Sequence, residues 1–393
     1  MTKSKTKTIK NPNLMVCLLY SEDHQNLKRM ANLIANSGEE YFKIKSISFS
    51  SKNYILYLKR SFEIILYLLK NKVDFIILVE PWYPIVFYLI LKHNKSKMIY
   101  WSGNINYDVL KTLGYGRLLI TIIKITEITI IKRSNLIIAD SEALTKFFSN
   151  YNSTANIYYI PENLEDEEIK HENEDIMDMR IIQGQTKVFN IVYLSSIHLV
   201  AINHRMLPRG WELIEVCKTM IESGMKNFNF TIIGGGKGLD DLKKLISIYH
   251  LEDYFIVTGF VSDTKKEELM KKMDVGFCED YKSFLTHKYN LSSKIQEYLR
   301  YGIPVITGKQ GDKREVICSG ERTCGVCIEP LDDKQGNDYV RYINDIRNSI
   351  LSLKLDVKEL EEMKKNCRLE YSQRFSKTAI KKKFEEVFRF ITT

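Results

Sequence analysis

Three glycines in the second half of the chain have the spacing of a phosphate-binding turn. Gly234, Gly235 and Gly236 follow a predicted strand that ends at Ile233 and precede a predicted helix from Leu239. Glycines at a strand-to-helix turn allow a tight bend and a close approach of the backbone to a phosphate, and the helix N-terminus favours negative charge. The turn lacks the G-x-x-x-x-G-K-[ST] pattern of a Walker A loop. A tight turn without a ligand fits the same residues, so both interpretations stay open.

A second candidate is the helix predicted to begin at Ser293. Ser293 with Gln296 three residues later is the pattern of a capping box, which predicts free amide donors at the helix start. Lys294 adds a positive charge in the first turn, so this end suits a diphosphate. Glu297, about one turn further on, has a carboxylate that can accept hydrogen bonds from two ribose hydroxyls. The alternative is a capped amphipathic helix whose Glu297 faces water.

Two arginines lie in a loop that precedes the helix predicted from Gly210. Arg205 and Arg209 belong to residues 201–210, and this loop is longer than a strand-to-helix connection usually is. A basic loop beside a cleft suits a phosphate group. The alternative for Arg205 is a loop arginine that faces solvent.

The seven cysteines predict neither a disulfide framework nor a metal site. Their number is odd and they are spread over a long chain, which favours a reducing compartment and hence the cytoplasm. Cys318, Cys324 and Cys327 include a C-x-x-C pair, but a zinc site needs four ligands and no fourth is near. We expect these three cysteines to be small core residues.

The elements that position the candidate residues form two α/β domains. A chain of 393 residues with 44% hydrophobic residues can bury two cores. Short apolar runs alternate with helical stretches from Leu14 to Ile160 and again from Val188 to Thr307. This alternation predicts two doubly wound, Rossmann-like domains, and residues 338–391 predict helices only. Ligands of such sheets lie beyond the carboxyl ends of the strands, so we expect a site where the two domains face each other across a cleft.

The domain boundaries follow from composition. Residues 1–13 are polar and basic and predict a mobile tail, which precedes an N-terminal domain at 14–161. Residues 162–187 are acidic and lack a period, which is typical of a linker. We expect a C-terminal domain at 188–375 and, at 376–393, a helix that packs back on the N-terminal domain through an apolar stripe.

Several motifs of the C-terminal domain occur together in a recognisable order. They are Thr231-Ile-Ile-Gly-Gly-Gly236, Val257-Thr-Gly-Phe-Val261, Met273-Asp-Val-Gly276, Lys294 to Glu297 and Gly302-Ile-Pro-Val-Ile306. This series resembles the donor-binding half of retaining glycosyltransferases of family 4, which belong to the GT-B class, and Arg209-Gly210 resembles the Lys-Gly that opens the first helix of that half. More faintly, residues 134–142 and 159–163 resemble the last two strands of the family's acceptor domain. The resemblance implies a GT-B fold with two Rossmann-like domains.

The resemblance also implies a donor, a nucleotide sugar linked to UDP or GDP, and a place for each of its parts. The expected base contacts are Gly259, Phe260 and Val261, the ribose contact is Glu297, and the diphosphate lies between Arg209, the glycine turn and the helix start at Ser293, with Arg205 as a second cation. Transfer in this family proceeds with retention and without a metal ion or cofactor. Charge grows on the leaving phosphate as the glycosidic bond breaks, so fixed cations and helix dipoles act on the transition state. Arg209, Lys294 and Glu297 are therefore the expected catalytic residues.

The chain departs from the family pattern at two positions that bear on the sugar. The family often has two glutamates eight residues apart, and Tyr289 stands where the first would fall. Glu279 or Asp280, just past the strand predicted to end at Cys278, is the expected substitute. The family's acceptor domain often has a histidine where this chain has residues 101–104, so Ser102 and Asn104 are candidates for the sugar pocket. The acceptor is expected to be a glycan or a lipid-linked molecule in surface glycan or glycoprotein assembly.

The charge of the first domain bears on which partners it could bind. Residues 1–161 hold 22 Lys and Arg against 11 Asp and Glu, a net charge of +11, which suits an anionic partner. No helix-turn-helix, zinc-finger or RNP pattern is present, so nucleic acid is not expected. The apolar stretches 54–70, 84–92 and 117–133 are expected to be mostly core, and peripheral contact with an anionic membrane is the alternative. The loss of the first glutamate and of the histidine leaves a second function open, a non-catalytic GT-B-like protein that binds a glycan or partner and scaffolds an enzyme.

Overall fold

The computed structural model describes most of the chain as two compact units. The described residues are 14–21, 25–38, 41–49, 54–79, 96–112, 114–162, 188–203, 205–319, 322–334 and 338–392. The predicted tail at 1–13, nearly all of the predicted linker at 162–187 and the apolar stretch 84–92 lie outside them. Unit 1 comprises residues 1–166, 288–290 and 374–393, and unit 2 comprises residues 167–287 and 291–373.

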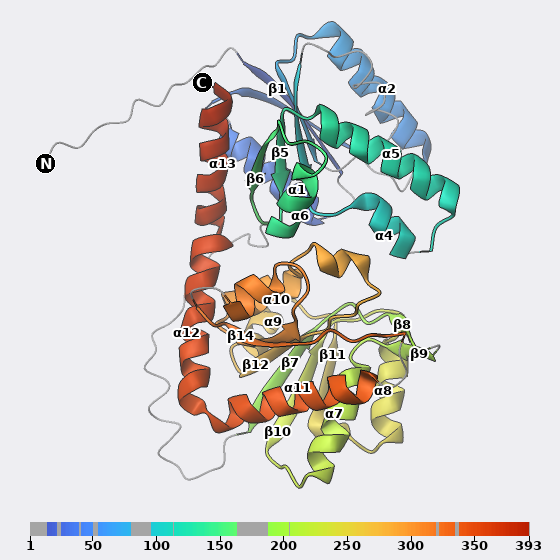
Figure 1. Ribbon diagram of the computed structural model, residues 1–393, viewed down its shortest axis with the longest axis vertical. Helices are drawn as coiled ribbons and strands as arrows, with labels where there is room; N and C mark the ends of the chain where they lie inside the picture. The colour runs from blue at the N-terminus through green and yellow to red at the C-terminus, as the bar shows by residue number, and fades with distance from the viewer. Residues whose placement is uncertain are drawn as a thin grey trace, which may run out of the picture. The chain divides into compact units, whose positions relative to one another are not determined.

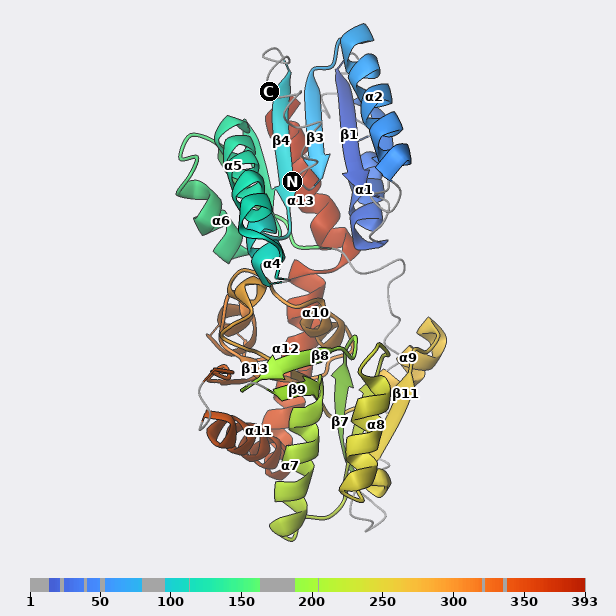
Figure 2. The same ribbon diagram turned by 90° about the vertical axis from the view of Figure 1, so that its right-hand side faces the viewer.

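Unit 1 is built on a sheet of six parallel strands in the order β2-β1-β3-β4-β5-β6. Figure 2 shows β1, β3 and β4 side by side. The strands are β1 (Met15–Ser21), β2 (Lys43–Phe49), β3 (Phe75–Val79), β4 (Lys97–Ser102), β5 (Leu136–Ala139) and β6 (Asn156–Tyr159). The helices are α1 (Gln25–Gly38), α2 (Tyr54–Lys70), α4 (Asn106–Thr112), α5 (Arg117–Arg133), α6 (Glu142–Ser149) and α13 (Lys377–Thr392). Their alternation with the strands gives the parallel connections that the sequence predicts.

Helices cover both faces of this sheet (Figure 1). Alternate residues of each strand face opposite sides, so Val16 and Leu18 of β1 pack with α1 and α13 in one core cluster. Cys17 and Leu19 pack with α2, α5 and α6 in the other. The apolar stripe of α13 is buried at Phe384, Val387 and Phe388 on the first face. The C-terminal helix is thus part of the core of unit 1.

The helix α5 is buried mainly along its second half. Ile130 and Ile131 pack in the core cluster on the sheet, whereas four apolar side chains nearer the start of the helix are exposed, namely Leu118, Leu119, Ile122 and Ile125. The prediction that this stretch is mostly core is therefore wrong for its first half. The α-helical period turns these four residues away from the sheet, and α4 packs beside them without burying a residue of its own.

Unit 2 is also built on six parallel strands, in the order β11-β10-β7-β12-β13-β14. The strands are β7 (Phe189–Leu194), β10 (Phe228–Ile233), β11 (Phe255–Gly259), β12 (Val275–Cys278), β13 (Val305–Gly308) and β14 (Gly325–Ile328), and an antiparallel hairpin of β8 (Leu199–Ile202) and β9 (Arg205–Pro208) stands beside them. The α-helices are α7 (Trp211–Glu222), α8 (Leu239–Ile248), α9 (Asp263–Met270), α10 (Ser293–Arg300), α11 (Asp338–Leu355) and α12 (Val357–Arg374). Both sheets and the C-terminal helices confirm the predicted α/β class.

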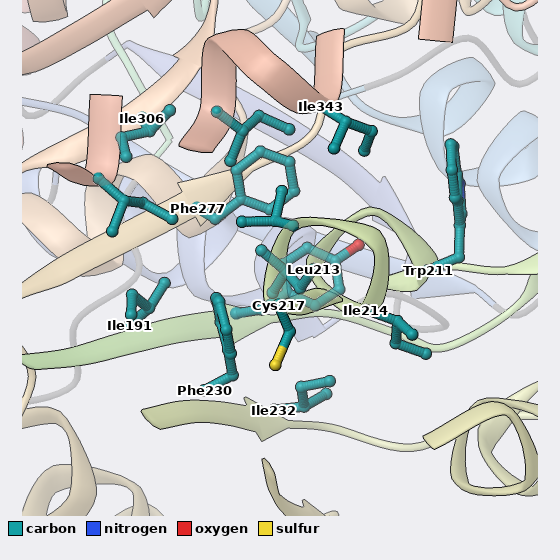
Figure 3. Close-up of a cluster of buried hydrophobic side chains, with 14 of the residues drawn as sticks. Ile191, Trp211, Leu213, Ile214, Cys217, Phe230, Ile232, Phe277, Ile306 and Ile343 are labelled. Atoms are coloured by element: carbon teal, nitrogen blue, oxygen red, sulfur yellow. The ribbon is translucent and has the colours of Figure 1, made fainter. Parts of the chain in front are cut away.

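The core of unit 2 joins α7 and α11 to one face of its sheet. Figure 3 shows Leu213, Ile214 and Cys217 of α7 beside side chains of the strands, and all of them are buried. On the opposite face, the hydroxyl of Tyr298 in α10 accepts a hydrogen bond from the amide of Leu194 at 2.8 Å. The end of β7 is thus held from both faces, which matters because the candidate residues lie around this end.

The hairpin and a disulfide differ from what the sequence indicates. Residues 199–208 form β8 and β9 with a tight turn at Asn203, whose φ is 47°, instead of a loop. The expectation of three core cysteines is wrong for two, because Cys318 and Cys327 form a disulfide. The π-helix at Arg314–Ser319 packs against β14 and brings the two thiols together. Cys324 is buried and free as predicted.

Candidate functional site

The strand order of unit 2 fixes where a ligand is expected. Counting within the unit, the strands run in the order 3-2-1-4-5-6, so the order reverses between β7 and β12, which pair directly. In open α/β sheets, ligands bind beyond the carboxyl ends of the strands at such a switch point. Glu279 is the residue directly after β12, and Ser195 is the residue directly after β7. The candidate side chains gather around these two ends.

Glu279 lies between two cations. Its carboxylate accepts hydrogen bonds from Lys294 Nζ at 2.7 and 2.6 Å, and Nε of Arg209 lies 3.8 Å from Oε1. Burial alone would raise the pKa of Glu279, but the charges of Lys294 and Arg209 outweigh it and lower that pKa to about 2. The Glu279 side chain is 3% exposed, whereas those of Lys294 and Arg209 are 15% and 23% exposed. The two cations are thus partly exposed to solvent, whereas the carboxylate between them is buried.

Aromatic rings and the backbone hold the two cations in place. Lys294 Nζ lies 4.7 Å from the ring centre of Tyr193, and the guanidinium carbon of Arg209 lies 5.7 Å from that of Phe284. The amide of Arg209 donates to the carbonyl of His198 at 2.9 Å. Two positive groups are therefore fixed at the switch point, which is an arrangement that can hold an anion.

A second layer of polar residues lies next to this group. Asp280 is buried, accepts a hydrogen bond from the side chain of Gln310, and forms an ion pair with Lys313, whose Nζ is 2.8 Å away. Nδ1 of His287 lies 3.0 Å from the same carboxylate. Burial opposes ionisation of Asp280, yet the bond to His287 and the charge of Lys313 lower its pKa. Asp280 is thus engaged in holding the loops, and Glu279 is the carboxylate that faces the cations.

The glycine turn has a packing reason of its own. Gly234 and Gly236 have φ of 130° and 151°, and a Cβ atom there would lie 1.9 Å from the carbonyl oxygen of Ser195 and 2.4 Å from that of Ile197. The amide of Ile197 donates to the carbonyl of Gly235 at 3.0 Å. Close packing on the loop after β7 therefore explains these glycines without a ligand. The same loop carries His198, so it links the turn to Arg209.

The predicted base-binding segment meets the glycine turn. Gly259 ends β11 with φ of 69°, and its carbonyl accepts a hydrogen bond from the amide of Gly234 at 2.9 Å. A Cβ at Gly235 would lie 2.8 Å from the ring of Phe260. Phe260 is 79% exposed and Val261 is half-buried. The open ring of Phe260 offers a flat apolar surface beside the turn.

The start of α10 differs in detail from the predicted capping box. Ser292 occupies the N-cap position without a side-chain cap bond, and Ser293 is the first helical residue. Gln296 Oε1 is buried and has no hydrogen-bond partner among the described residues. The capping-box prediction is therefore wrong, because the helix begins one residue earlier than a box with Ser293 at the N-cap requires. Lys294 nevertheless lies in the first turn.

Glu297 is buried rather than facing water. It is 8% exposed, and its Oε1 lies 2.9 Å from Nζ of Lys266 in α9 and 3.9 Å from Nη1 of Arg300. Glu297 is three residues after Lys294, so the two project from the same side of α10 about one turn apart. Its carboxylate is fixed between α9 and α10.

Arg205 lies apart from the other candidates. It is exposed on β9 and lines a pocket of about 410 Å³ together with Asn203, Trp211 and Tyr339, whereas Arg209, Glu279 and Lys294 do not line it. Four residues of extended chain span about 13 Å, so the strand carries Arg205 away from Arg209. The expectation of a second phosphate cation at Arg205 is therefore not met. The hairpin that separates the two arginines was not predicted.

The candidates in unit 1 form an uncharged edge. Ser102 ends β4, is buried, and donates a hydrogen bond to the carbonyl of Asn104 at 2.7 Å. The side-chain amide of Asn290 donates a hydrogen bond to Oδ1 of Asn104. Tyr289, at the position of the family's glutamate, packs its ring 5.5 Å from that of Phe147. The segment 288–290 thus contributes to the side of unit 1 that carries Ser102 and Asn104.

One carboxylate in unit 1 is sealed from solvent. Glu127 of α5 is fully buried and accepts hydrogen bonds from the backbone amide of Asn106 at 3.0 Å and from its side chain at 2.9 Å. Burial raises the pKa of Glu127, and these bonds act against the increase. Glu127 therefore fixes the start of α4.

Two further observations on the described residues concern metal binding and membrane spanning. Within them, no three His, Cys, Asp or Glu side chains are grouped so that they could hold a metal ion. None of the described helices is long and apolar enough to cross a membrane.

Comparison with known proteins places these features in a class. Residues 211–370, all of them in unit 2, match the family model described as "Glycosyl transferases group 1". The matched stretch contains Glu279, Lys294 and Glu297. No curated protein sequence matches the chain significantly.

Solved structures share the whole fold at low sequence identity. HepE from Anabaena, in complex with UDP, is 15% identical, with a TM-score of 0.65 and coverage of 96% of this chain and 100% of that chain. Sucrose-phosphate synthase from Thermosynechococcus elongatus is 12% identical, with a TM-score of 0.66 and coverage of 96% and 99%. TarM from S. aureus is 17% identical, with a TM-score of 0.55 and coverage of 84% and 59%. These similarities confirm the two-domain GT-B fold that the sequence predicts.

Some residues of the site had no signal in the sequence. Tyr193 looks like any strand residue, and Lys266 and Lys313 look like solvent-facing lysines, yet they support Lys294, Glu297 and Asp280. Glu212 looks like an ordinary helical acid but is fully buried. A charged residue on the apolar face of α7 was the one available hint.

Proposed function

We propose that the protein is a retaining glycosyltransferase that moves a sugar from a nucleotide-sugar donor to a glycan or lipid-linked acceptor without a metal ion. The observation that carries the proposal is the pair of cations, Arg209 and Lys294, fixed around buried Glu279 at the switch point of unit 2, which contains the match to the glycosyltransferase group 1 model. The donor is proposed to be UDP-linked first and GDP-linked second, because the similar HepE structures contain UDP and UDP-glucose.

The chemistry follows from where charge develops. The bond between the sugar and the β-phosphate oxygen breaks, and its electron pair stays on that oxygen. The acceptor oxygen forms the new bond on the same face of the sugar, and its proton passes to the leaving phosphate oxygen. Arg209 and Lys294 are positioned to stabilise the phosphate charge as it grows. Fixed cations need no reorganisation at that moment, so they lower the barrier more than they tighten ground-state binding. This is the physical basis for proposing metal independence.

The other candidate residues take the remaining parts of the donor. Glu297 is proposed to hold the ribose, and the segment Gly259–Val261 is proposed to hold the base against the exposed ring of Phe260. Glu279 is proposed to orient Lys294 and to contact the sugar hydroxyls in place of the glutamate that Tyr289 replaces. Ser102 and Asn104 are proposed to face the neutral sugar or acceptor, because they present uncharged hydrogen-bonding groups.

The direct experiment combines ligand-induced stabilisation with an assay for the leaving group. The midpoint of thermal unfolding is measured with UDP, UDP-glucose, GDP, GDP-mannose and no ligand, and nucleoside diphosphate release is then followed in the same samples. A ligand at about a hundred times its Kd adds roughly 2.7 kcal/mol to stability. Stabilisation by one nucleotide and slow donor hydrolysis are expected. No shift with any of them would contradict the proposed donor.

Membrane contact is a further part of the proposal, and the exposed face of α5 supports it. Leu118, Ile122 and Ile125 are 77%, 51% and 59% exposed. Arg117 and Lys124 are exposed beside them, and the acid of this helix, Glu127, is buried. An apolar face ringed by cations suits the surface of an anionic bilayer. The chain is expected to co-sediment with anionic liposomes at low salt and not with neutral ones, and Leu118→Glu with Ile122→Glu is expected to abolish this.

A non-catalytic function remains the second candidate, because Tyr289 packs in the core of unit 1 where the family often has a glutamate. Such a protein would bind a glycan or a partner and leave the donor intact. Nucleotide binding without any release of nucleoside diphosphate, in the presence of candidate acceptors, would favour it.

A further inference from the structure

Glu212 is a buried acid next to the candidate site, and nothing in the proposed reaction uses it. It lies in the first turn of α7, three residues after Arg209, and is fully buried. The hydroxyl of Tyr281 donates a hydrogen bond to its Oε1. Oε2 has no hydrogen-bond partner among the described residues. A buried carboxylate with one unpaired oxygen is costly, and the cost falls if it holds a proton.

The groups that face Glu212 come from several elements. They are Arg209, Tyr193 of β7, Glu279 and Tyr281 of the segment after β12, Lys294 of α10 and Tyr342 of α11. Both cations of this set are engaged with Glu279. Burial raises the pKa of Glu212 to about 7, the bond from Tyr281 opposes this, and the negative charge of Glu279 adds to the increase.

A chain of contacts links Glu212 to Arg209. The ring of Tyr281, whose hydroxyl bonds Glu212, lies edge-on to Phe284 with ring centres 5.0 Å apart. Phe284 is the ring on which the guanidinium of Arg209 rests. The backbone gives a second link, because Gly210 has φ of 91° and its added Cβ would lie 3.2 Å from the ring of Tyr193. The conformation of Arg209 is thus tied to the start of α7.

We propose that Glu212 is a positioning residue that holds a proton while a nucleoside diphosphate occupies the site, and that its ionisation weakens donor binding. This rests on the proposed function. With Glu212 protonated, Arg209, Lys294, Glu279 and Glu212 carry a net charge of +1. When Glu212 releases its proton to solvent, the net charge of the group is zero and a negative charge lies beneath the cations. The site then attracts a diphosphate less strongly.

The test measures the affinity for UDP-glucose between pH 6 and 8.5 by calorimetry. The phosphates of this donor lack the terminal ionisation near pH 6 that UDP has, so the ligand's charge stays constant. The wild-type Kd is expected to rise by about tenfold across this range, given one added charge at short distance. Glu212→Gln, which keeps the shape without the charge, is expected to bind at every pH as the wild type does at pH 6.

A matched control and a second variant keep the result interpretable. Glu215→Gln changes an acid one turn further along α7, where Glu215 pairs with Lys218, and is expected to keep the wild-type pH dependence. Tyr281→Phe keeps the carboxyl but removes the bond that favours its charged form, so the midpoint of the pH dependence is expected to move upward. Equal pH dependence in the wild type and Glu212→Gln would overturn the inference.

The ligand-free chain gives a readout that does not depend on the donor. Between the usual glutamate pKa of about 4.3 and the folded value near 7, the folded chain holds a proton that the unfolded chain has lost. The unfolding midpoint of the wild type is therefore expected to fall, relative to Glu212→Gln, as pH rises through this window and to level off above it. The absence of this fall would overturn the inference. No binding of UDP-glucose or GDP-mannose at any pH would instead overturn the proposed function.

Discussion

The two sheets of this protein have the same number of parallel strands but different chemistry at their carboxyl ends. In unit 2, the strand order reverses between β7 and β12, and two cations and a carboxylate gather there. In unit 1, the end of β4 carries Ser102 and Asn104, which bond to each other, and Asn104 also bonds Asn290. Glu127, which fixes the start of α4, is buried in the core, and the acid Asp140 directly follows the neighbouring strand β5. The fold is thus shared, but two fixed cations suit the site of unit 2 to an anion, whereas the candidate residues of unit 1 are neutral and polar.

Arg209, Lys294 and Glu279, at the carboxyl ends of β7 and β12, form the charged edge of unit 2. The largest effect is expected from Arg209→Ala, which removes one of its two fixed cations. Because the phosphate charge grows in the transition state, kcat is expected to fall by about 100-fold to 1,000-fold, with a smaller change in the KM for the donor. Steady-state kinetics with the donor identified by thermal stabilisation measures both. Lys243→Ala, on the exposed face of α8, is the control and should leave both constants unchanged. An unchanged kcat in Arg209→Ala would show that this cation does not act in the reaction, and the two units would then not differ in function as proposed.

The sequence predicted the elements of both sheets better than the contacts within the charged edge. Apolar runs separated by helical periods report burial directly, so the alternation of strands and helices was predicted, and β10 and β12 end at Ile233 and Cys278 as predicted. Glu279 and Lys294 were each named, but their hydrogen bonds join the segment after β12 to α10 and could not be predicted from spacing. The hairpin of β8 and β9 was missed because its strands have four residues each and half of those residues are exposed or nearly so. The sequence near a residue does not reveal which distant segments its side chain contacts. For this reason the burial of Glu212 could not be predicted.

The next largest effect is expected from Glu297→Ala, which tests how far the charged edge of unit 2 extends along α10. Loss of hydrogen bonds from a carboxylate to two hydroxyls is expected to raise the Kd for UDP by about tenfold and to change kcat less. Isothermal calorimetry measures the affinity. Glu268→Gln in α9, an exposed acid that also pairs with lysines, is the matched control. Equal affinity of Glu297→Ala and the wild type would show that Glu297 only joins α10 to Lys266.

A smaller effect is expected from Asn104→Ala at the uncharged edge of unit 1. Loss of one neutral hydrogen bond, worth about 1 kcal/mol, is expected to raise the KM for the acceptor by about fivefold. Donor hydrolysis without acceptor should not change, because the donor residues lie in unit 2. Asn135→Ala, at the opposite end of the same strands, where Asn135 bonds the amide of Met98, should leave the acceptor KM as it is. A larger effect on donor hydrolysis than on the acceptor KM would mean that the two edges do not divide the substrates as proposed.

The smallest effect is expected from Arg205→Ala, and it tests whether the charged edge depends on position or on basic charge in general. Arg205 and Arg209 are four residues apart, and the sequence analysis expected both near the diphosphate, but β9 is extended and carries Arg205 to another pocket. If fixed position at the switch point matters, Arg205→Ala is expected to change kcat and the donor KM by less than about twofold, against the large loss in Arg209→Ala. If both variants lost activity equally, a diffuse positive potential would explain donor binding, and raising the salt concentration would then weaken both enzymes alike. A fixed cation held between Glu279 and Phe284 is instead expected to be much less sensitive to salt, because partly buried pairs are screened less than exposed charges.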